Sequence, residues 1–137
     1  IDADTLSKMQ EFLFAGSCDD AATLETIRKT YEKYGYLVDT HTAVALRVYE
    51  EYVEKTGDAT KTVIASTASP YKFGKSVLGA LGEAVPSDDF AILSALEEKS
   101  GLPVPNALGS LREKKVRFTK SCAPDKMREA VKELLEI

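Results

Sequence analysis

The chain has 137 residues, 44% of them hydrophobic, which is enough to bury the core of one globular domain. Its formal net charge is −4, and its 18 basic residues form no stripe suited to a nucleic-acid backbone. No apolar run approaches the roughly 20 residues that span a bilayer, and the first residues lack the pattern of a signal peptide. We therefore expect a cytoplasmic protein that binds neither nucleic acid nor membranes.

Three amphipathic helices are predicted in the first half of the chain. A cap at Asp4 and apolar residues three and four positions apart predict a short helix that ends near Phe14. A second helix begins at Asp19 and ends at Gly35, where a left-handed conformation favours glycine. A third covers residues 42–55, and its broad apolar face indicates burial on more than one side.

Residues 62–66 are predicted to form a strand. The segment is nearly continuous in its apolarity, which is typical of a strand covered on both faces of a parallel sheet. Such a strand needs neighbours, and only residues 115–119 offer another extended segment, with the alternating charges of an edge. We expect an α/β fold that is predominantly helical, with several helices around one or two strands of an incomplete parallel sheet. Its unpaired edge favours self-association or marginal stability.

The rest of the chain is predicted to be helical. Ser69 and Pro70 are suited to the N-cap and the first residue of a helix. No internal repeat or low-complexity linker marks a second unit, so residues 1–137 are expected to form a single domain. The helices predicted in this half cover residues 69–81, 87–100, 106–113 and 124–135.

The two cysteines carry no recognisable chemistry. Cys18 and Cys122 lie far apart and outside any CxxC or Cys/His cluster, so no metal site and no redox motif are predicted. In a reducing compartment we expect two free thiols.

Two blocks of sequence closely resemble threonine synthase, a pyridoxal-phosphate enzyme of the tryptophan-synthase-like fold type. They are HTAVA at residues 41–45 and STASPYKF at residues 66–73. The resemblance extends over essentially the whole chain and corresponds to the C-terminal third of the family. Members of the family often have proline before the histidine, where this chain has Thr40, so the backbone of this loop is less constrained.

The resemblance implies a parent enzyme that is a lyase of threonine biosynthesis. That enzyme converts O-phospho-L-homoserine and water to L-threonine and phosphate with pyridoxal 5'-phosphate, and the hydroxyl that contacts the pyridine nitrogen corresponds to Thr67. The Schiff-base lysine of the family, and the loop that holds the cofactor phosphate, lie upstream of the part represented here. We therefore expect this chain alone to bind no cofactor, to contain no catalytic residue and to be inactive.

Ser66 and Thr67 are the predicted cofactor-binding residues. Ligands bind beyond the carboxyl ends of strands in open α/β sheets, and these hydroxyls stand at such an end. A hydroxyl can donate to a ring nitrogen but is too weak an acid to protonate it, so a pyridoxal ring would remain a weak electron sink. The alternative is that both residues only cap the next helix or satisfy backbone groups.

His41 and Lys72 are the predicted substrate-binding residues. His41 is the only histidine, the residue type that most often exchanges protons near neutral pH in proteins, although a histidine in the first turn of a helix is often a local packing residue. Lys72 in a first helical turn could reach an anionic substrate, or it could be a solvated surface charge.

A second class of function is a stand-alone helical α/β interaction domain without catalysis, whose sheet is completed by a partner or a second copy. A nucleotide-binding domain is disfavoured because neither GxGxxG nor GxxxxGK[ST] follows the predicted strand.

Overall fold

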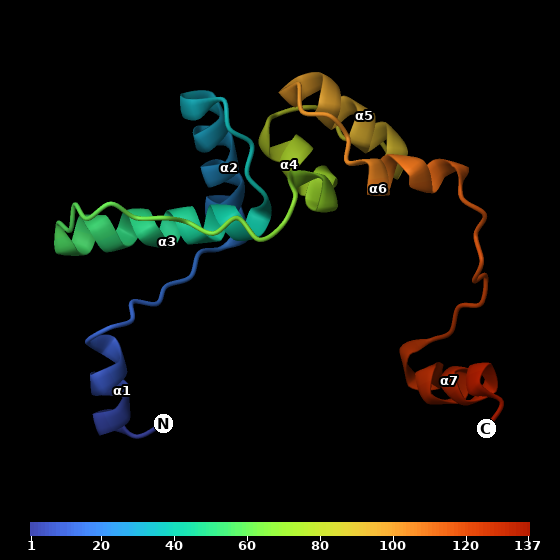
Figure 1. The fold of residues 1–137 in the computed structure, drawn as a ribbon, viewed down its shortest axis with the longest axis horizontal. Coiled ribbons are helices and arrows are strands. Elements are labelled where there is room, and N and C mark those ends of the chain that lie inside the picture. Colours follow the sequence, from blue (N-terminus) through green and yellow to red (C-terminus); the bar gives the residue numbers. More distant parts are fainter.

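The computed structural model describes residues 1–137, and its regular structure is entirely helical (Figure 1). None of these helices combines the length and the apolar character that crossing a membrane requires. The α-helices are α1 (Ala3–Gln10), α2 (Asp20–Tyr34), α3 (Thr40–Thr56), α4 (Gly74–Ala80), α5 (Asp89–Ser100), α6 (Asn106–Gly109) and α7 (Met127–Leu135). The 3₁₀ helices are η1 (Pro70–Phe73), η2 (Ser110–Glu113) and η3 (Pro124–Lys126).

The predicted sheet is absent, so the prediction of an α/β fold with one or two strands was wrong. Residues 62–66 form no strand and run back along α3, and the side chain of Val63 is 90% exposed (Figure 1). Residues 115–119 also form no strand, and they lie on the opposite side of the molecule. A strand exists only where a neighbour accepts its ladder hydrogen bonds, and neither segment has one.

A helical body, from α2 to η2, contains the core of the molecule. Helix α2 packs against α3 and α4, and α4 packs against η1 and α5. Tyr71 of η1 is buried, and its hydroxyl donates to the carbonyl oxygen of Leu102, which ties η1 to the segment after α5. The buried hydrophobic residues of this core are Ile27, Leu37, Val38, Ala43, Tyr71, Val77, Leu78, Ala80, Ile92 and Leu96.

The terminal helices, α1 and α7, contribute no buried residue. Each lies away from the helical body, at the end of a connecting segment (Figure 1). Self-association of the chain stays a prediction, and the exposed apolar side chains of α1 and α7 now support it in place of a strand edge.

The boundaries of α2, α3 and α5 follow local capping chemistry, since each helix begins after an aspartate cap and ends at a glycine in the left-handed conformation. Asp19 accepts a hydrogen bond from the backbone of Ala22, and Gly35 ends α2 with a φ of 64°, which confirms both predicted ends. Helix α3 begins at Thr40, two residues earlier than predicted, because Asp39 is its N-cap. The cap of this helix is therefore a carboxylate, which accepts a hydrogen bond from the backbone N–H of His41.

The helix predicted after Ser69 is divided into two parts. Ser69 is the N-cap, and Pro70 is the first residue, as predicted. The first turn is the 3₁₀ helix η1, and α4 follows it from Gly74, whose backbone lies close to Ile92 of α5. A Cβ at Gly74 would stand 2.9 Å from the Cγ2 of Ile92, so this close approach of α4 and α5 depends on glycine.

Candidate functional site

A polar network joins the start of α3 to the extended segment that returns along it. The Oδ1 of Asp39 accepts a hydrogen bond of 2.9 Å from the backbone N–H of His41, and its Oδ2 accepts one from the hydroxyl of Thr42. The Oγ1 of Thr42 lies 3.1 Å from the Oγ of Ser66. This contact connects two positions that are 24 residues apart in the sequence.

Asp39 is fully buried, with 0% of its surface exposed. Burial by itself raises the pKa of Asp39, but hydrogen bonds from the Thr42 hydroxyl and from backbone N–H groups outweigh it, and the pKa lies below its ordinary value. The group is therefore a carboxylate at neutral pH. A buried charge is costly unless donors surround it, and the first turn of α3 supplies those donors.

His41 lies at the surface beside this carboxylate. Its Nδ1 is 3.2 Å from the Oδ1 of Asp39 and 3.4 Å from the hydroxyl of Thr40. Its ring centroid is 4.9 Å from that of Phe73 in η1, and 61% of its side chain is exposed. The contacts of Nδ1 and of the ring with Phe73 thus hold the imidazole in place, while the rest of the ring is exposed to solvent.

Ser66 and Thr67 are both exposed, but their hydroxyls differ in their partners. The Ser66 hydroxyl contacts Thr42, whereas the Thr67 hydroxyl makes no hydrogen bond within the chain. The next helix is capped by Ser69, whose Oγ accepts from the backbone N–H of Tyr71 at 3.3 Å. Neither Ser66 nor Thr67 is therefore the cap of the next helix.

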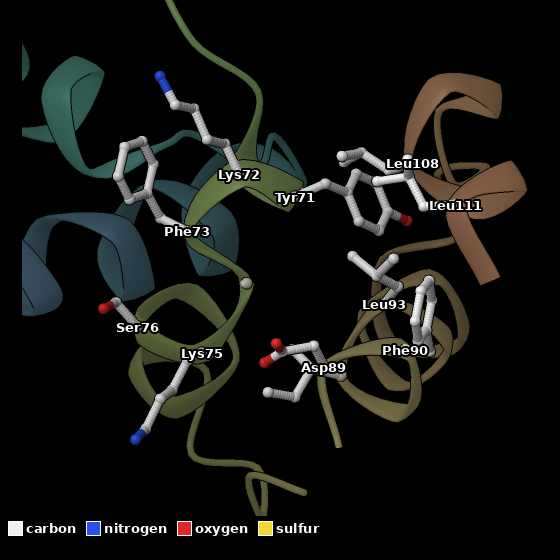
Figure 2. Close-up of a pocket in the computed structure, with 12 residues that line it drawn as sticks. Tyr71, Lys72, Phe73, Lys75, Ser76, Asp89, Phe90, Leu93, Leu108 and Leu111 are labelled. Atoms are coloured by element: carbon white, nitrogen blue, oxygen red, sulfur yellow. The ribbon is translucent and has the colours of Figure 1, made fainter. Parts of the chain in front are cut away.

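A hollow of about 540 Å³ lies on the other side of η1, between α4 and the helices α5, α6 and η2 (Figure 2). Figure 2 shows the amines of Lys72 and Lys75 pointing away from it, while the carboxylate of Asp89 lies between α4 and α5. Its other lining residues include Phe90, Leu93, Leu108 and Leu111. An apolar hollow with a carboxylate inside and its lysines turned outward is poorly suited to a phosphate group.

Lys72 stands apart from the polar network. Its side chain is exposed, and its amine lies 5.5 Å from the ring centroid of Phe73. It has no carboxylate partner. The chain also contains no group of three or more His, Cys, Asp or Glu side chains placed to hold a metal ion.

The structure thus brings Ser66 and His41 together through Asp39 and Thr42, two residues that the sequence analysis did not select. A signal for Asp39 was present, since an aspartate directly before a Thr-His-Thr helix start is a typical N-cap. Nothing in the sequence signalled the contact between Thr42 and Ser66, because it depends on the path of residues 57–66 along α3.

Comparison with known proteins gives a consistent result. The family model described as "Threonine synthase, C-terminal" matches residues 42–135, well over half of the chain. The chain is 37% identical to the threonine synthase of Methylobacillus glycogenes over 82 residues, which cover 59% of the chain and 17% of that protein. It is 30% identical to threonine synthase-like 1 of Mus musculus over 123 residues, covering 88% of the chain and 16% of the relative.

A third relative is the threonine synthase of Schizosaccharomyces pombe, with 45% identity over 56 residues, 40% of the chain and 11% of the relative. The chain thus spans less than a fifth of the length of these relatives. Both sequence blocks that meet in the polar network fall almost entirely within the region that the family model matches.

Proposed function

The chain belongs to the threonine synthase C-terminal family, and on that premise we propose that it is the C-terminal part of a threonine synthase. The proposed whole enzyme is a lyase that uses pyridoxal 5'-phosphate to convert O-phospho-L-homoserine and water to L-threonine and phosphate. The proposal rests on a contact between two segments that are distant in the sequence. The two blocks that most resemble the family meet, because Ser66 contacts Thr42 and the His41 ring lies against Phe73.

Thr67 fits the role of donor to the pyridine nitrogen of the cofactor. Its hydroxyl is exposed and has no partner within the chain, so its proton is available. When bound, the cofactor supplies an electron sink for the carbon that carries the substrate amine. Because a hydroxyl donates a hydrogen bond without giving up its proton, Thr67 would keep the ring nitrogen neutral.

The neighbouring residues have positioning and substrate-binding roles in this proposal. Ser66 holds the segment that carries Thr67 against α3 through Thr42. Lys72 offers an exposed ammonium group to the phosphate of O-phosphohomoserine, outside the apolar hollow, and His41 offers an exposed imidazole. The proposed partners are therefore small molecules, with no role for nucleic acid or a membrane.

We propose that the 137 residues alone release no phosphate from O-phospho-L-homoserine. The relatives are several times longer than the matched segment, and the resemblance assigns the cofactor-bearing lysine and the phosphate-binding loop to other parts of the family.

Substitutions at Thr67 in the whole enzyme test the proposal. Thr67→Val keeps the shape of the side chain but removes the donor, which leaves a buried acceptor unpaired at a cost of roughly 1 to 3 kcal/mol. Cofactor affinity or turnover should fall by about one to two orders of magnitude. Thr67→Asp should favour a protonated ring and divert the reaction to side products, and Thr67→Ser should be the mildest change.

Phosphate release and the cofactor absorbance spectrum are the measurements. Thr62→Val is the matched control, because Thr62 lies on the same extended segment and bonds only to the carbonyl oxygen of Thr60. If the three Thr67 variants matched the wild type in turnover and spectrum, the assignment of Thr67 would be wrong. Phosphate release by the 137-residue chain alone would contradict the proposed division of the active site.

A further inference from the structure

Asp39 is a buried carboxylate with no lysine or arginine partner, and its neighbours are the hydroxyl of Thr42 and the backbone and ring of His41. We propose that Asp39 is the positioning residue of this site. It fixes which atoms of Thr42, Ser66 and His41 carry protons, and thereby which atoms are left to meet a ligand.

The direction of the hydroxyl bonds follows from proton counting. An ionised carboxylate only accepts hydrogen bonds, and a hydroxyl can donate only one hydrogen bond. Because the hydroxyl proton of Thr42 points to Asp39, the 3.1 Å contact between Thr42 and Ser66 is a hydrogen bond only if Ser66 donates. Ser66 thus keeps free lone pairs but has no free proton. Thr67 is then the remaining hydroxyl donor of the Ser-Thr pair.

The same argument fixes the tautomer of His41. Its Nδ1 faces the Oδ1 of Asp39 at 3.2 Å, and a bare ring nitrogen would place two lone pairs against each other. The hydroxyl of Thr40 could donate to a bare Nδ1, but it lies farther away, at 3.4 Å, and carries no charge. Nδ1 therefore carries the proton, and in the neutral ring Nε2 is a free acceptor.

Asp39 thus leaves the Ser66 oxygen and the His41 Nε2 as acceptors, while Thr67, the residue after Ser66, keeps a free hydroxyl proton. The acceptors fit a ligand that brings protons, such as an ammonium group or a water molecule. Their use in catalysis rests on the proposed function. The proton positions themselves do not, since they follow from the contacts within this chain.

The single histidine makes the tautomer directly measurable. In the folded chain labelled with ¹⁵N-histidine, a long-range ¹H–¹⁵N spectrum is recorded on the alkaline plateau of the ring resonances, where the ring is neutral. We expect the Nδ1 resonance of a protonated, pyrrole-like nitrogen and the Nε2 resonance of a bare, pyridine-like one. A wild-type ring that is mainly protonated at Nε2 would overturn the proposal without any variant.

Asp39→Ser tests whether the carboxylate is the cause. Serine keeps the N-cap of α3 but removes the charge and the acceptor-only character. The Nδ1-protonated form should then change from the majority to the minority species. Asp58→Asn is the control, since Asp58 also accepts from a hydroxyl but does not contact His41, and it should leave the tautomer unchanged. An unchanged tautomer in Asp39→Ser would show that Asp39 does not fix it.

Thr42→Val separates the two branches of the network. It removes the link to Ser66 but leaves the contact between Asp39 and His41, so the Nδ1-protonated form should persist. Loss of that form in Thr42→Val would show that Asp39 does not fix the His41 tautomer independently of Thr42. These spectra need no cofactor or turnover, so a failure here is distinct from a failure of the Thr67 series.

Discussion

The helical body and the terminal helices obey the same local rules but differ in what they bury. Helix α7 separates its apolar and polar sides far more sharply than α5 does. Yet α5 buries Ile92 and Leu96, whereas α7 buries no residue. Amphipathic spacing thus indicates only that a helix has an apolar face suited to packing. Whether that face is buried depends on whether another element lies against it.

The difference also explains why a weakly amphipathic helix can lie in the core. Helix α5 meets α4 on one side and the segment after Gly101 on another, so apolar side chains are needed around much of its circumference. Leu93 and Ala95 accordingly pack against the core from other sides of the same helix. The presence of a single apolar face along a helix is therefore a poor predictor of which helices form the core of this molecule.

The largest expected effect separates the two regions directly. Leu96 is 0% exposed, and Leu96→Ala should lower the free energy of unfolding by about 2 to 5 kcal/mol, since it removes packed methyl groups and leaves a cavity. Leu134 of α7 is 69% exposed, and Leu134→Ala should change it by no more than about 0.5 kcal/mol. Urea denaturation followed by circular dichroism measures both. Equal midpoints for the two variants would mean that the two regions do not differ in packing.

The sequence predicted several features that depend on a few adjacent residues, although α1 begins after the cap Asp2 and ends at Gln10, not at the predicted Asp4 and Phe14. The ends of α2 at Asp19 and Gly35 and the cap at Ser69 follow from side-chain and backbone chemistry within one helical turn. The strand at residues 62–66 failed because pairing requires a second segment, and an apolar run contains no information about whether one is adjacent.

For the candidate site too, the sequence indicated individual residues but not the contacts between them. The sequence analysis selected Ser66, Thr67, His41 and Lys72, but only the fold shows that Ser66 and His41 belong to one network. Asp39 escaped selection because its role depends on complete burial, which it shares with the preceding core residues Leu37 and Val38. Burial at a helix start cannot be deduced from the capping pattern alone.

The ends of α5 and α7 give a second, smaller contrast. Gly101 ends α5 with a φ of 69°, and no other atom would meet an added Cβ, so Gly101→Ala should cost roughly 1 to 2 kcal/mol through backbone conformation alone. In α7 the corresponding position is Glu136, with a φ of 55°. Glu136→Gly should relieve the same local cost in α7 without moving the unfolding midpoint of the helical body.

Thermal unfolding monitored by tyrosine fluorescence reports on the body, whose tyrosines all lie between residues 31 and 71. A lower midpoint is expected for Gly101→Ala only. If Glu136→Gly raised that midpoint, α7 would be stabilising the body, and the contrast between the two regions would be lost.

The smallest expected effect concerns an acid-sensitive contact at the end of α3. The hydroxyl of Tyr52 donates to Asp58 at 2.7 Å, and this bond, with those from Thr60, lowers the pKa of Asp58 from 3.8 to about 2. A depressed carboxylate pKa adds stability above pH 3.8, and that stability is lost as the pH falls from about 4 toward 2. Asp58→Asn should therefore flatten the decline of unfolding free energy in this range.

Two further variants test whether the acid sensitivity comes from the Tyr52–Asp58 contact of the helical body or also from the C-terminal segment. Tyr52→Phe removes the donor, so it should flatten the acid decline in the same sense and add little to Asp58→Asn in the double variant. Glu133 of α7 pairs with Lys120 in the exposed C-terminal segment, and Glu133→Gln should leave the acid unfolding of the body unchanged. Denaturant titrations between pH 5 and pH 2 measure the wild type and the four variants, so that they cover the range in which Asp58 takes up its proton. An acid slope that changed as much in Glu133→Gln as in Asp58→Asn would show that the terminal helix unfolds together with the body.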